Sequence, residues 1–452
     1  MTYEQKEKTK ESKGLKENKK QKTKKCDLSL SDIPTLILSH SHTPNLLISQ
    51  SPNPKLKKNK TKSFHFLHTK KLIMKFFILF ALVACAFAHN KKAMEIHVFK
   101  VGQADSQLIV FPSGYSILID AGDRDTKNAK HTKHIAKRVE AILGHKKLDV
   151  FVISHYHIDH FGKKGVNGIW YLLEKKGFTV KKFLKRNAGT YNGSKLSGCK
   201  KSTISWKYVG TMSETTAKFI CYATSTKDKT KLSKVAENAH RCNNKQVAPP
   251  DVGAKVTVLI RDALGVKSTS SGKKLYRNSM GASKPVAEND FSICMRIEYG
   301  KFVYSTCGDL SGNTYTAGDK RYHDVESSVA PMMGEVDVYH VNHHGSKSAT
   351  NSKWTKTLKP TVAVISCGDG SLPNAQPLKN LKGVKATVYT TQTNCGSNVN
   401  KYSNIVEMGD DVVITVPTNG TKFTVASPSG KKSKTYEIKQ NKKAPTACKK
   451  LE

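Results

Sequence analysis

The sequence predicts an α/β fold, and three observations support that class. Short apolar runs separated by glycine and proline recur along most of the chain and are typical of strands. The segment 127–143 has apolar residues at helical spacing and is followed by a continuous apolar strand at 149–153. Polar groups crowd directly after that strand, at 155–160. We therefore expect strands and helices in one core, with a polar loop at a strand end.

The first three expected strands form a meander. The third strand, the helix at 127–143 and the strand at 149–153 then form a strand-helix-strand unit. Gly102 and the Pro-Ser-Gly at 112–114 separate the first runs, and Ile135, Val139 and Ile142 mark one face of the first helix. A second helix is expected at 168–176. The strands expected in this half are 96–101, 107–111, 116–119 and 149–153.

The middle of the chain is less regular. Residues from 181 to about 287 hold three cysteines and many Lys, Ser, Thr and Asn, and 256–260 is the one strand that the pattern indicates there. We interpret this interval as a Cys-containing insertion in the domain. Strands resume afterwards, and those expected are 291–299, 302–305, 336–341, 361–366, 387–390, 412–416 and 421–425.

The N-terminal part has a different composition. Residues 1–73 carry 17 Lys, no Arg and 6 acidic residues without a sustained apolar period, which predicts a disordered basic extension. Residues 74–88 follow with a positive start, an apolar core and an Ala-Phe-Ala exit, the three parts of a secretory signal peptide. We expect translation to start at Met74 and the mature protein to begin at His89. The alternative is an internal membrane anchor behind a cytosolic tail.

Charge and cysteine content point to an exported protein that meets anions. The whole chain has a formal charge of +41, and 89–452 holds 58 basic and 29 acidic residues, so it keeps +29. It also holds eight cysteines, an even number that suggests disulfides in an oxidising compartment, with no Cys-x-x-Cys spacing. Residues 431–452 are expected to be a basic C-terminal tail, and 89–430 the folded domain.

The strongest chemical signal is the loop after the strand at 149–153. It holds His155, His157, Asp159 and His160 within six residues. Imidazole and carboxylate donors suit zinc, manganese or iron, and four such groups at this spacing can serve two metal ions. The segment resembles the His-x-His-x-Asp-His signature of the metallo-β-lactamase fold superfamily.

Four further motifs make the chain similar to one branch of that superfamily, the soluble domain of the bacterial competence protein ComEC and related secreted phosphodiesterases. All five motifs occur in the order of the branch and spread from about 95 to 350. The four are Val-Gly-Gln-Ala-Asp at 101–105, Asp-Ala-Gly at 120–122, Gly-Asp at 308–309 and His-His-Gly-Ser at 343–346. The resemblance implies a four-layer αββα sandwich with a dinuclear metal site, most simply of zinc.

The resemblance also implies a role for each matching residue. His155 and His157 would bind one ion, Asp159 and His160 the other, and Asp309 would bridge the two. His343 or His344 would complete the second position. Asp120 and Asp105 would orient the ligands rather than bind metal. Two ions held this way hydrolyse a substrate without a protein nucleophile. Asp159 and Asp309 are the residues expected to act in catalysis.

The chain departs from the superfamily at two positions. The interval between the metal loop and Asp309 contains one histidine, His240, and nothing around it marks it as a ligand. Where the branch has His-Pro near the C-terminus, this chain has Gln376-Pro377. Gln376 could contact a substrate by a hydrogen bond, but it cannot transfer a proton at neutral pH.

Together these observations predict a secreted metal-dependent hydrolase, and the positive charge favours nucleic acid, DNA or RNA, as its substrate. After cleavage of the signal peptide no stable membrane span is expected. One alternative is a small-molecule phosphodiesterase, such as a phosphorylcholine-type esterase. The other is a non-catalytic anion-binding protein with a decayed site, which Gln376 favours and the complete metal loop disfavours.

Overall fold

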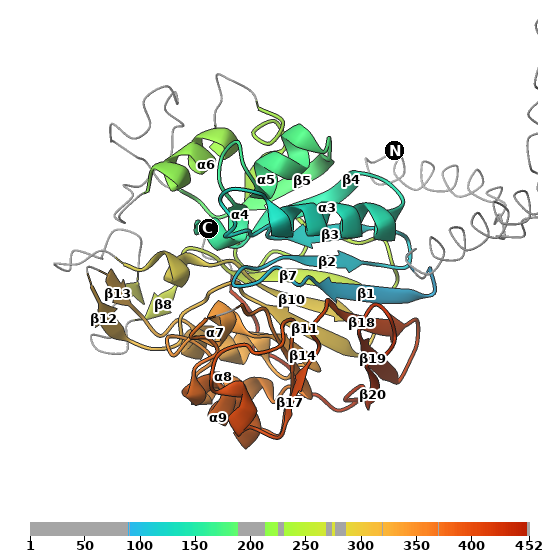
Figure 1. The fold of residues 1–452 in the computed structure, drawn as a ribbon. Helices are drawn as coiled ribbons and strands as arrows, with labels where there is room; N and C mark the ends of the chain where they lie inside the picture. The colour runs from blue at the N-terminus through green and yellow to red at the C-terminus, as the bar shows by residue number, and fades with distance from the viewer. Residues whose placement is uncertain are drawn as a thin grey trace, which may run out of the picture. The chain divides into compact units, whose positions relative to one another are not determined.

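The computed structural model describes residues 89, 91–188, 213–224, 230–267, 274–275, 286–318, 320–368 and 370–449. The extension 1–73 and the signal peptide 74–88 lie outside these residues. In the described residues the strands form a nine-stranded sheet, a seven-stranded sheet and two short two-stranded ribbons. Helices cover the outer faces of both large sheets, which gives the expected α/β fold with four αββα layers (Figure 1).

The nine-stranded sheet contains both ends of the described chain. Its order is β20-β19-β18-β1-β2-β3-β4-β5-β6, with β3, β4, β5 and β6 parallel and the rest antiparallel. The strands are β1 (Ala93–Val98), β2 (Gln107–Val110), β3 (Ser116–Ile119), β4 (Lys147–Ile153), β5 (Thr179–Lys185), β6 (Ala236–Asn238), β18 (Val412–Pro417), β19 (Lys422–Ala426) and β20 (Ser433–Glu437).

The seven-stranded sheet has the order β17-β16-β15-β14-β11-β10-β7, and its strands from β11 to β17 are parallel. The strands are β7 (Ala254–Ile260), β10 (Cys294–Tyr299), β11 (Phe302–Thr306), β14 (Val338–His340), β15 (Val362–Ile365), β16 (Thr387–Thr390) and β17 (Ile405–Glu407). The ribbons pair β8 (Val266–Lys267) with β9 (Lys274–Leu275), and β12 (Tyr315–Ala317) with β13 (Lys320–Tyr322).

Helices lie on both sides of this pair of sheets (Figure 1). Those over the nine-stranded sheet are α3 (Lys130–Leu143), α4 (Ile158–Phe161), α5 (Gly168–Trp170), the π-helical turn η2 (Tyr171–Lys175) and α6 (Glu214–Thr224). Those over the seven-stranded sheet are α7 (Glu326–Met333), α8 (Ser352–Leu358) and α9 (Ala375–Gly383). Three 3-10 turns complete the described elements: η4 (Glu288–Phe291), η5 (Asn342–Gly345) and η6 (Val399–Lys401).

Alternation along the strands builds the layers. In β4, Val150 and Val152 pack between the two sheets, whereas Phe151 and Ile153 pack under the helices of the first sheet. Strand β15 repeats this pattern, because successive strand residues point to opposite faces. Both faces of the central strands are therefore buried, which explains their continuous apolar sequences.

Part of the interval 181–287 that we expected to be an irregular insertion is sheet. Strand β5 runs parallel to β4, β6 pairs with β5, and β7 is the edge strand of the second sheet, antiparallel to β10. Strand β5 has Lys181, Lys182 and Lys185 among its seven residues, so its apolar pattern was too weak to reveal it. The remaining segments of this interval, at 189–212, 225–229, 268–273 and 276–285, lie outside the described residues.

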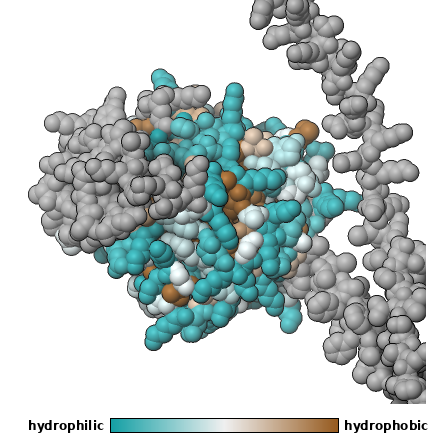
Figure 2. Space-filling model, turned by 90° about the horizontal axis from the view of Figure 1, so that it is seen from above, coloured by the Kyte–Doolittle hydropathy of each residue, from teal (hydrophilic) through white to brown (hydrophobic). Residues whose placement is uncertain are grey.

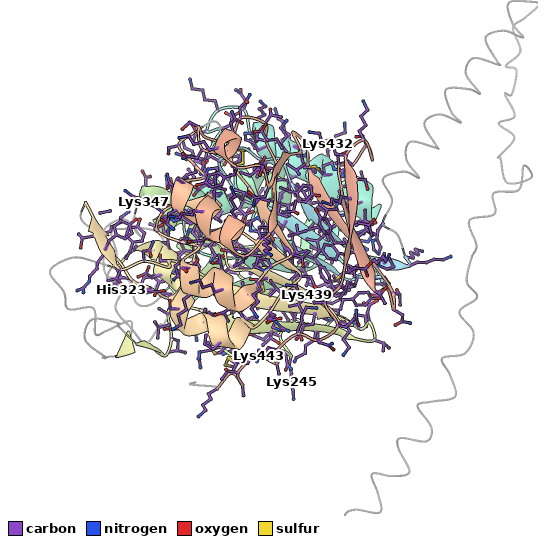
Figure 3. The ribbon with its side chains drawn as sticks, turned by 90° about the horizontal axis from the view of Figure 1, so that it is seen from below. Lys245, His323, Lys347, Lys432, Lys439 and Lys443 are labelled. Atoms are coloured by element: carbon purple, nitrogen blue, oxygen red, sulfur yellow. A yellow bond between two sulfur atoms is a disulfide. The ribbon has the colours of Figure 1, made fainter. Side chains whose placement is uncertain are left out.

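The C-terminal segment also differs from the expected free tail. Strand β20 pairs with β19, and Cys448 forms a disulfide with Cys242. Between them, the Lys439 backbone N–H donates to buried Asp337 at 3.0 Å, and Lys442 forms a 2.7 Å ion pair with the same carboxylate. Lys439 and Lys443 of this segment are labelled in Figure 3, which shows the molecule from below the view of Figure 1. Residues 431–449 are therefore part of the fold.

Disulfides connect loops on the second sheet. Besides Cys242–Cys448, the described residues contain the pairs Cys294–Cys307 and Cys367–Cys395, and Cys221 is also disulfide-bonded. Cys307, two residues before Asp309, is therefore a buried cystine residue and not a free thiol. No helix in the described ranges is both long and apolar enough to cross a membrane.

Candidate metal centre

The candidate site lies where parallel strands of the two sheets end. Asp120 follows β3, and the loop with His155 and His160 follows its neighbour β4. Asp309 follows β11, and the two histidines of η5 follow its parallel neighbour β14. Parallel strands bring their carboxyl ends to one sheet edge, so residues far apart in sequence meet there.

Backbone contacts fix the metal loop against two of the sequence motifs. The Asp105 N–H donates to the Asp159 carbonyl at 3.0 Å, and the Ala121 N–H donates to the His160 carbonyl at 2.8 Å. A Cβ on Gly122 would lie 1.6 Å from the Asp159 carbonyl oxygen, so no other residue fits that position. The motifs at 101–105 and 120–122 thus hold the backbone of the metal loop in place.

Asp120 orients His160. Its two carboxylate oxygens accept from the Ser154 N–H and the Ser154 hydroxyl, both at 2.7 Å, and Oδ2 also lies 2.8 Å from Nδ1 of His160. A carboxylate can only accept, so His160 carries a proton on Nδ1, and this contact directs Nε2 toward the site. Asp120 is fully buried, as the proposed orienting role requires.

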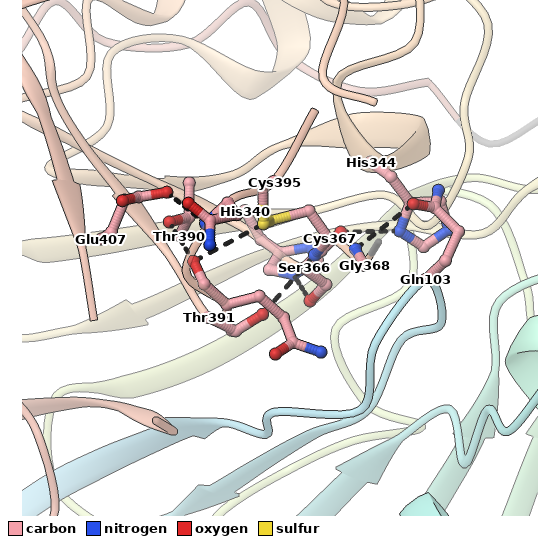
Figure 4. The surroundings of a disulfide bond; sticks show 12 residues. Gln103, His340, His344, Ser366, Cys367, Gly368, Thr390, Thr391, Cys395 and Glu407 are labelled. Atoms are coloured by element: carbon pink, nitrogen blue, oxygen red, sulfur yellow. Dashed lines mark hydrogen bonds between the residues drawn. A yellow bond between two sulfur atoms is a disulfide. The ribbon is translucent and has the colours of Figure 1, made fainter. Parts of the chain in front are cut away.

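His344 is oriented in the same way. Its Nδ1 lies 2.9 Å from the Ser366 carbonyl oxygen, which can only accept, so its Nε2 also presents a lone pair (Figure 4). His343 and His344 have φ angles of 52° and 53°, in the left-handed region, and the His343 N–H donates to the Gly308 carbonyl at 3.1 Å. Such backbone strain at consecutive non-glycine residues is typical of functional sites.

The side chains meet as two overlapping groups with donor atoms within 4.8 Å of one another: His155, His160 and Asp309 form one group, and Asp159, His160 and His344 form the other. His160 Nε2 lies 3.2 Å from Asp309 Oδ1, and His344 Nε2 lies 3.8 Å from both Asp159 Oδ2 and Asp309 Oδ1. A third group joins Asp105 and Asp120 to His160.

The two remaining histidines lie at the rim of these groups. His157 Nδ1 is 2.9 Å from His155 Nε2, so both nitrogens face one position. His343 Nε2 lies 3.6 Å from Asp309 Oδ2, but its ring also contacts Asn289 and the Ser348 hydroxyl. The His343 side chain is 20% exposed, against 3% for His344. The geometry therefore favours His344 over His343 for the second group.

The electrostatics of the cluster suit a cation. Burial lowers the pKa of His155 well below its usual value and also lowers that of His157, so both imidazoles are neutral. Burial works against the Asp309 carboxylate, yet His160 and His343 beside it hold its pKa well below the usual range. Burial likewise opposes charge on His160, but Asp309 and Asp120 raise its pKa well above normal. Carboxylates thus attract positive charge to this point.

The donor set fits a divalent metal. Nε2 of His160 and Nε2 of His344 are buried and, among the described residues, have no hydrogen-bond partner. His160 Nε2 does lie 3.2 Å from Asp309 Oδ1, and a divalent cation among these atoms would bind both nitrogens and the carboxylate. Neutral imidazoles and ionised carboxylates are the usual ligands of zinc, manganese and iron.

Comparison with known proteins gives partial matches. No family model matches the chain. It is 26% identical over 125 residues to recombination protein 2 of Haemophilus influenzae, and 29% identical over 128 residues to ComE operon protein 3 of Bacillus subtilis. These matches cover 27% and 28% of this chain, but 14% and 15% of the relatives, so the chain spans a small part of each.

One solved structure is described as "Putative metal-dependent hydrolase from Parabacteroides distasonis ATCC 8503". It aligns with 67% of this chain and 95% of its own, at 12% identity and a TM-score of 0.33. These values are too low to compare the two sites.

Two residues singled out by sequence are not among the groups of converging donor atoms. Gln376 is exposed on α9, and its amide nitrogen donates to Asn380 at 2.9 Å on the same helix. His240 is exposed, as expected for a surface residue. Asp105, in contrast, lies against the cluster, and its oxygens accept from Ser366 at 3.1 Å and from Gln107 at 3.3 Å. Burial raises the pKa of Asp105 to about 6.

Several supporting residues were not predicted from the sequence. His340 ends β14 within hydrogen-bonding distance of Gln107 and Ser366, and burial lowers its pKa to about 3. Glu288 accepts from the Tyr156 N–H at 2.8 Å and pairs with buried Arg186, which stacks on the Tyr156 ring at 4.1 Å. His340 lies three residues before the His-His-Gly-Ser motif, but Arg186 and Glu288 are 102 residues apart and carried no local signal.

Proposed function

We propose that the chain is a metal-dependent hydrolase of the metallo-β-lactamase type, related to the ComEC-like branch, that cleaves phosphodiester bonds in nucleic acid. The observation that carries the proposal is the pair of unpartnered nitrogens, Nε2 of His160 and Nε2 of His344, which converge with carboxylates at one edge of the sheets. The partial matches to two bacterial proteins, one of them a recombination protein by name, agree with nucleic acid as substrate.

In this proposal His155 and His157 hold a first ion, Asp159, His160 and His344 hold a second, and Asp309 lies between them. Two bound divalent cations supply Lewis acidity for a phosphoryl oxygen and lower the pKa of water. Asp120 and the Ser366 carbonyl fix the proton positions of His160 and His344. The proposal gives the catalytic role to Asp159 and Asp309, the carboxylates of these two groups of donor atoms.

The chain's own residues also shape the entrance. The Asp159 side chain is 19% exposed and His343 20%, whereas His155 and His160 are fully buried, so a substrate would approach past the first two. Burial lowers the pKa of His343 to about 4, so its ring is neutral at pH 7 and can hold a substrate oxygen only as a hydrogen-bond donor.

Secretion is part of the proposal. The disulfides of the described residues suit an oxidising compartment, and the segment 74–88 has the pattern of a signal peptide. N-terminal sequencing of the native protein tests this point. A chain that begins at His89 is expected, and recovery of residues 1–73 would contradict both export and the start at Met74.

The metal assignment is tested by elemental analysis of purified protein and of the variants His157→Ala and Asp159→Ala. The wild type should hold about two ions per chain, and each variant fewer, with hydrolysis abolished and the fold retained. His240→Ala is the matched control, because it removes an exposed histidine outside the cluster. Unchanged metal content in both site variants would refute the assignment.

Activity is tested by offering plasmid DNA, single-stranded DNA, RNA and bis-nitrophenyl phosphate to the metal-loaded protein. Cleavage of the polymers supports a nuclease. Turnover of the small diester alone would favour the small-molecule phosphodiesterase, and no turnover by protein that holds two metals would favour a decayed, anion-binding site.

A further inference from the structure

A second candidate binding feature is a cavity of about 710 Å³ outside the metal cluster. Three chain segments form most of its wall: 101–103, 124–131 and 370–372, with Gln392 closing one side. No sequence motif pointed to it as a binding site. It contains two exposed cationic side chains, Arg124 and Lys130, and the half-buried His131.

Each of the three wall segments also holds part of the candidate site. Gln103 is two residues from Asp105, and Arg124 is four residues from Asp120. The third segment begins near Ser366, whose carbonyl orients His344, and it reaches the cavity at Gly370. Since a residue spans at most about 3.5 Å, the cavity wall begins within about 7–14 Å of the residues that hold the cluster.

The wall is fixed by a disulfide and a hydrogen bond. Cys367 is bonded to Cys395, which connects the loop after β15 to the loop containing Gln392. Next to it, the Gly368 N–H donates to the Gln103 side-chain oxygen at 3.3 Å (Figure 4). Gln103 therefore keeps its oxygen toward Gly368 and leaves its amide N–H groups as donors.

The charge of the cavity suits an anion. The single carboxylate in the wall, Asp125, accepts from the backbone N–H groups of Lys127, Asn128 and Lys130 at 3.0–3.3 Å. Its oxygens are thus engaged by the loop, whereas Arg124 and Lys130 bring a guanidinium and an ammonium to the cavity lining. Guanidinium, ammonium and amide donors together recognise phosphate.

We propose that this cavity binds a phosphate group of a polynucleotide one to a few nucleotides from the bond that is cleaved. The inference rests on the proposed function, and it assigns that function to a polymer rather than a small diester. A nucleic-acid strand carries one charge about every 3.4 Å of duplex rise, so a strand with one phosphate at the metals can place another at this distance. Arg124 and Lys130 are then substrate-positioning residues.

The test compares two double variants that each remove two positive charges. Arg124→Ala/Lys130→Ala alters the cavity. Lys255→Ala/Lys422→Ala is the control, because each lysine pairs with a surface glutamate at the strand ends opposite the site. In the control pair, Lys255 is the second residue of β7 and Lys422 is the first residue of β19. Strand β19 pairs with β18, and β18 ends opposite the start of β1.

Binding is measured by fluorescence anisotropy with a labelled single-stranded DNA 12-mer in EDTA, from 50 to 200 mM salt. We expect the cavity variant to raise Kd about tenfold and to lower the slope of log K against log salt by about 1.4, as for two lost contacts on single strands. The control should shift Kd less than twofold. Equal effects of the two variants, or an unchanged Kd in the cavity variant, would overturn the proposal.

Turnover separates this inference from the proposed function. With metal present, the cavity variant should raise KM for the oligonucleotide and leave kcat and KM for bis-nitrophenyl phosphate unchanged. If the wild type cuts no diester, the proposed function fails, while the EDTA binding measurement still decides the cavity. Inorganic phosphate is the third probe. If the cavity variant loses phosphate binding but still binds the oligonucleotide like the wild type, the cavity binds a free anion, and the proposal is contradicted.

Discussion

Asp120 is a buried residue whose hydrogen bonds orient His160 in the candidate metal centre. Its φ of 60° lies in the left-handed region, which Asn also tolerates, so Asp120→Asn should keep the backbone. The new amide N–H₂ can face Nδ1 of His160, however, and would make that nitrogen an acceptor. The proton would move to Nε2, the atom that points into the cluster.

We therefore expect Asp120→Asn to weaken metal binding about 10- to 100-fold while the fold persists. Titration of zinc into metal-free protein, followed by calorimetry, measures the change. Asp149→Asn, on a carboxylate that pairs with exposed Lys181 at 2.7 Å, is the control and should bind metal normally. Wild-type affinity in Asp120→Asn would show that His160 is not oriented by this contact.

Asp411 is a second residue whose partners decide its behaviour. Its buried carboxylate accepts from Arg138 at 2.8 Å, from the Lys100 N–H at 2.8 Å and from His134 at 2.7 Å. His134, on helix α3, is thus paired with a buried carboxylate. Burial opposes this carboxylate, but His134 and the other donors still lower its pKa below the ordinary 3.8.

A lowered carboxylate pKa contributes stability above pH 3.8 that is lost as the pH falls below that value. Asp411→Asn should therefore cost about 2–4 kcal/mol of unfolding free energy at pH 7, and less as the pH drops below 4. Urea unfolding at several pH values measures this. The control is Glu140→Gln, on helix α3 with His134 and Arg138, where Glu140 forms an exposed ion pair with Lys146. This change should alter the free energy of unfolding by less than about 1 kcal/mol. A cost independent of pH would contradict the ionic origin.

At the scale of elements, sequence pattern predicted what depends on local order. Strand β3 and strand β16 were predicted at the residues where they occur, and β4 and β18 within two residues at each end, because continuous apolar runs need burial on both faces. The metal loop was predicted for the same reason, since it directly follows β4. Continuous apolar runs, and polar residues directly after them, can be recognised in a single sequence.

Elements that depend on partners were not predicted. Strand β5 has three lysines and is a strand because β4 and β6 pair with it on both sides. Helix α7 contains Pro331 and has no clear apolar stripe, because it is buried against the second sheet and α8. Likewise, the hydrogen bonds that favour His344 over His343 come from Ser366 and Ser348, and sequence spacing does not reveal them.

The C-terminal segment is the element whose role changed most, from expected tail to part of the fold. The Cys242–Cys448 disulfide closes a separation of 206 residues, so its loss frees a long loop in the unfolded chain. Cys242→Ser/Cys448→Ser should lower stability by about 2–5 kcal/mol. Limited proteolysis should then cut first after the lysines between 439 and 449.

Thermal unfolding and trypsin digestion of the double variant check this expectation. Cys448→Ser alone should behave like the double variant, because either change breaks the same bond. Metal content should stay at the wild-type level, since the segment contacts Asp337 and Pro331 rather than the cluster. A double variant as stable and as protease-resistant as the wild type would show that the segment is held by its hydrogen bonds alone.

At the scale of the whole molecule, charge is distributed over the fold rather than confined to one end. Lysines labelled in Figure 3 come from loops and segments as distant as Lys245, Lys347 and Lys432. The face in Figure 2 is mainly hydrophilic, with small apolar areas between polar side chains. On the proposed function, a surface of this kind would attract a polyanion without fixing its position, so the cavity and the metal cluster would supply the register of a bound strand.

This distribution leads to the last prediction, which concerns salt. Residues 89–452 carry 58 basic against 29 acidic residues, so a polynucleotide should contact several phosphates at once, whereas a small diester offers one charge. Counterion release should make log K for DNA or RNA fall with log salt at about −0.7 to −0.9 per phosphate contacted. Four contacts would weaken binding on the order of a hundredfold between 50 and 200 mM salt.

Turnover at saturating substrate should respond much less, because the catalytic groups are the same for both substrates and salt acts mainly on encounter and affinity. Steady-state kinetics on an oligonucleotide and on bis-nitrophenyl phosphate, across the same salt series, measure both effects. The expected pattern is a KM for the oligonucleotide that rises steeply with salt beside a flat kcat and a flat small-diester profile. Parallel, shallow profiles for the two substrates would mean that the basic surface does not hold the polymer, and would favour the small-molecule phosphodiesterase.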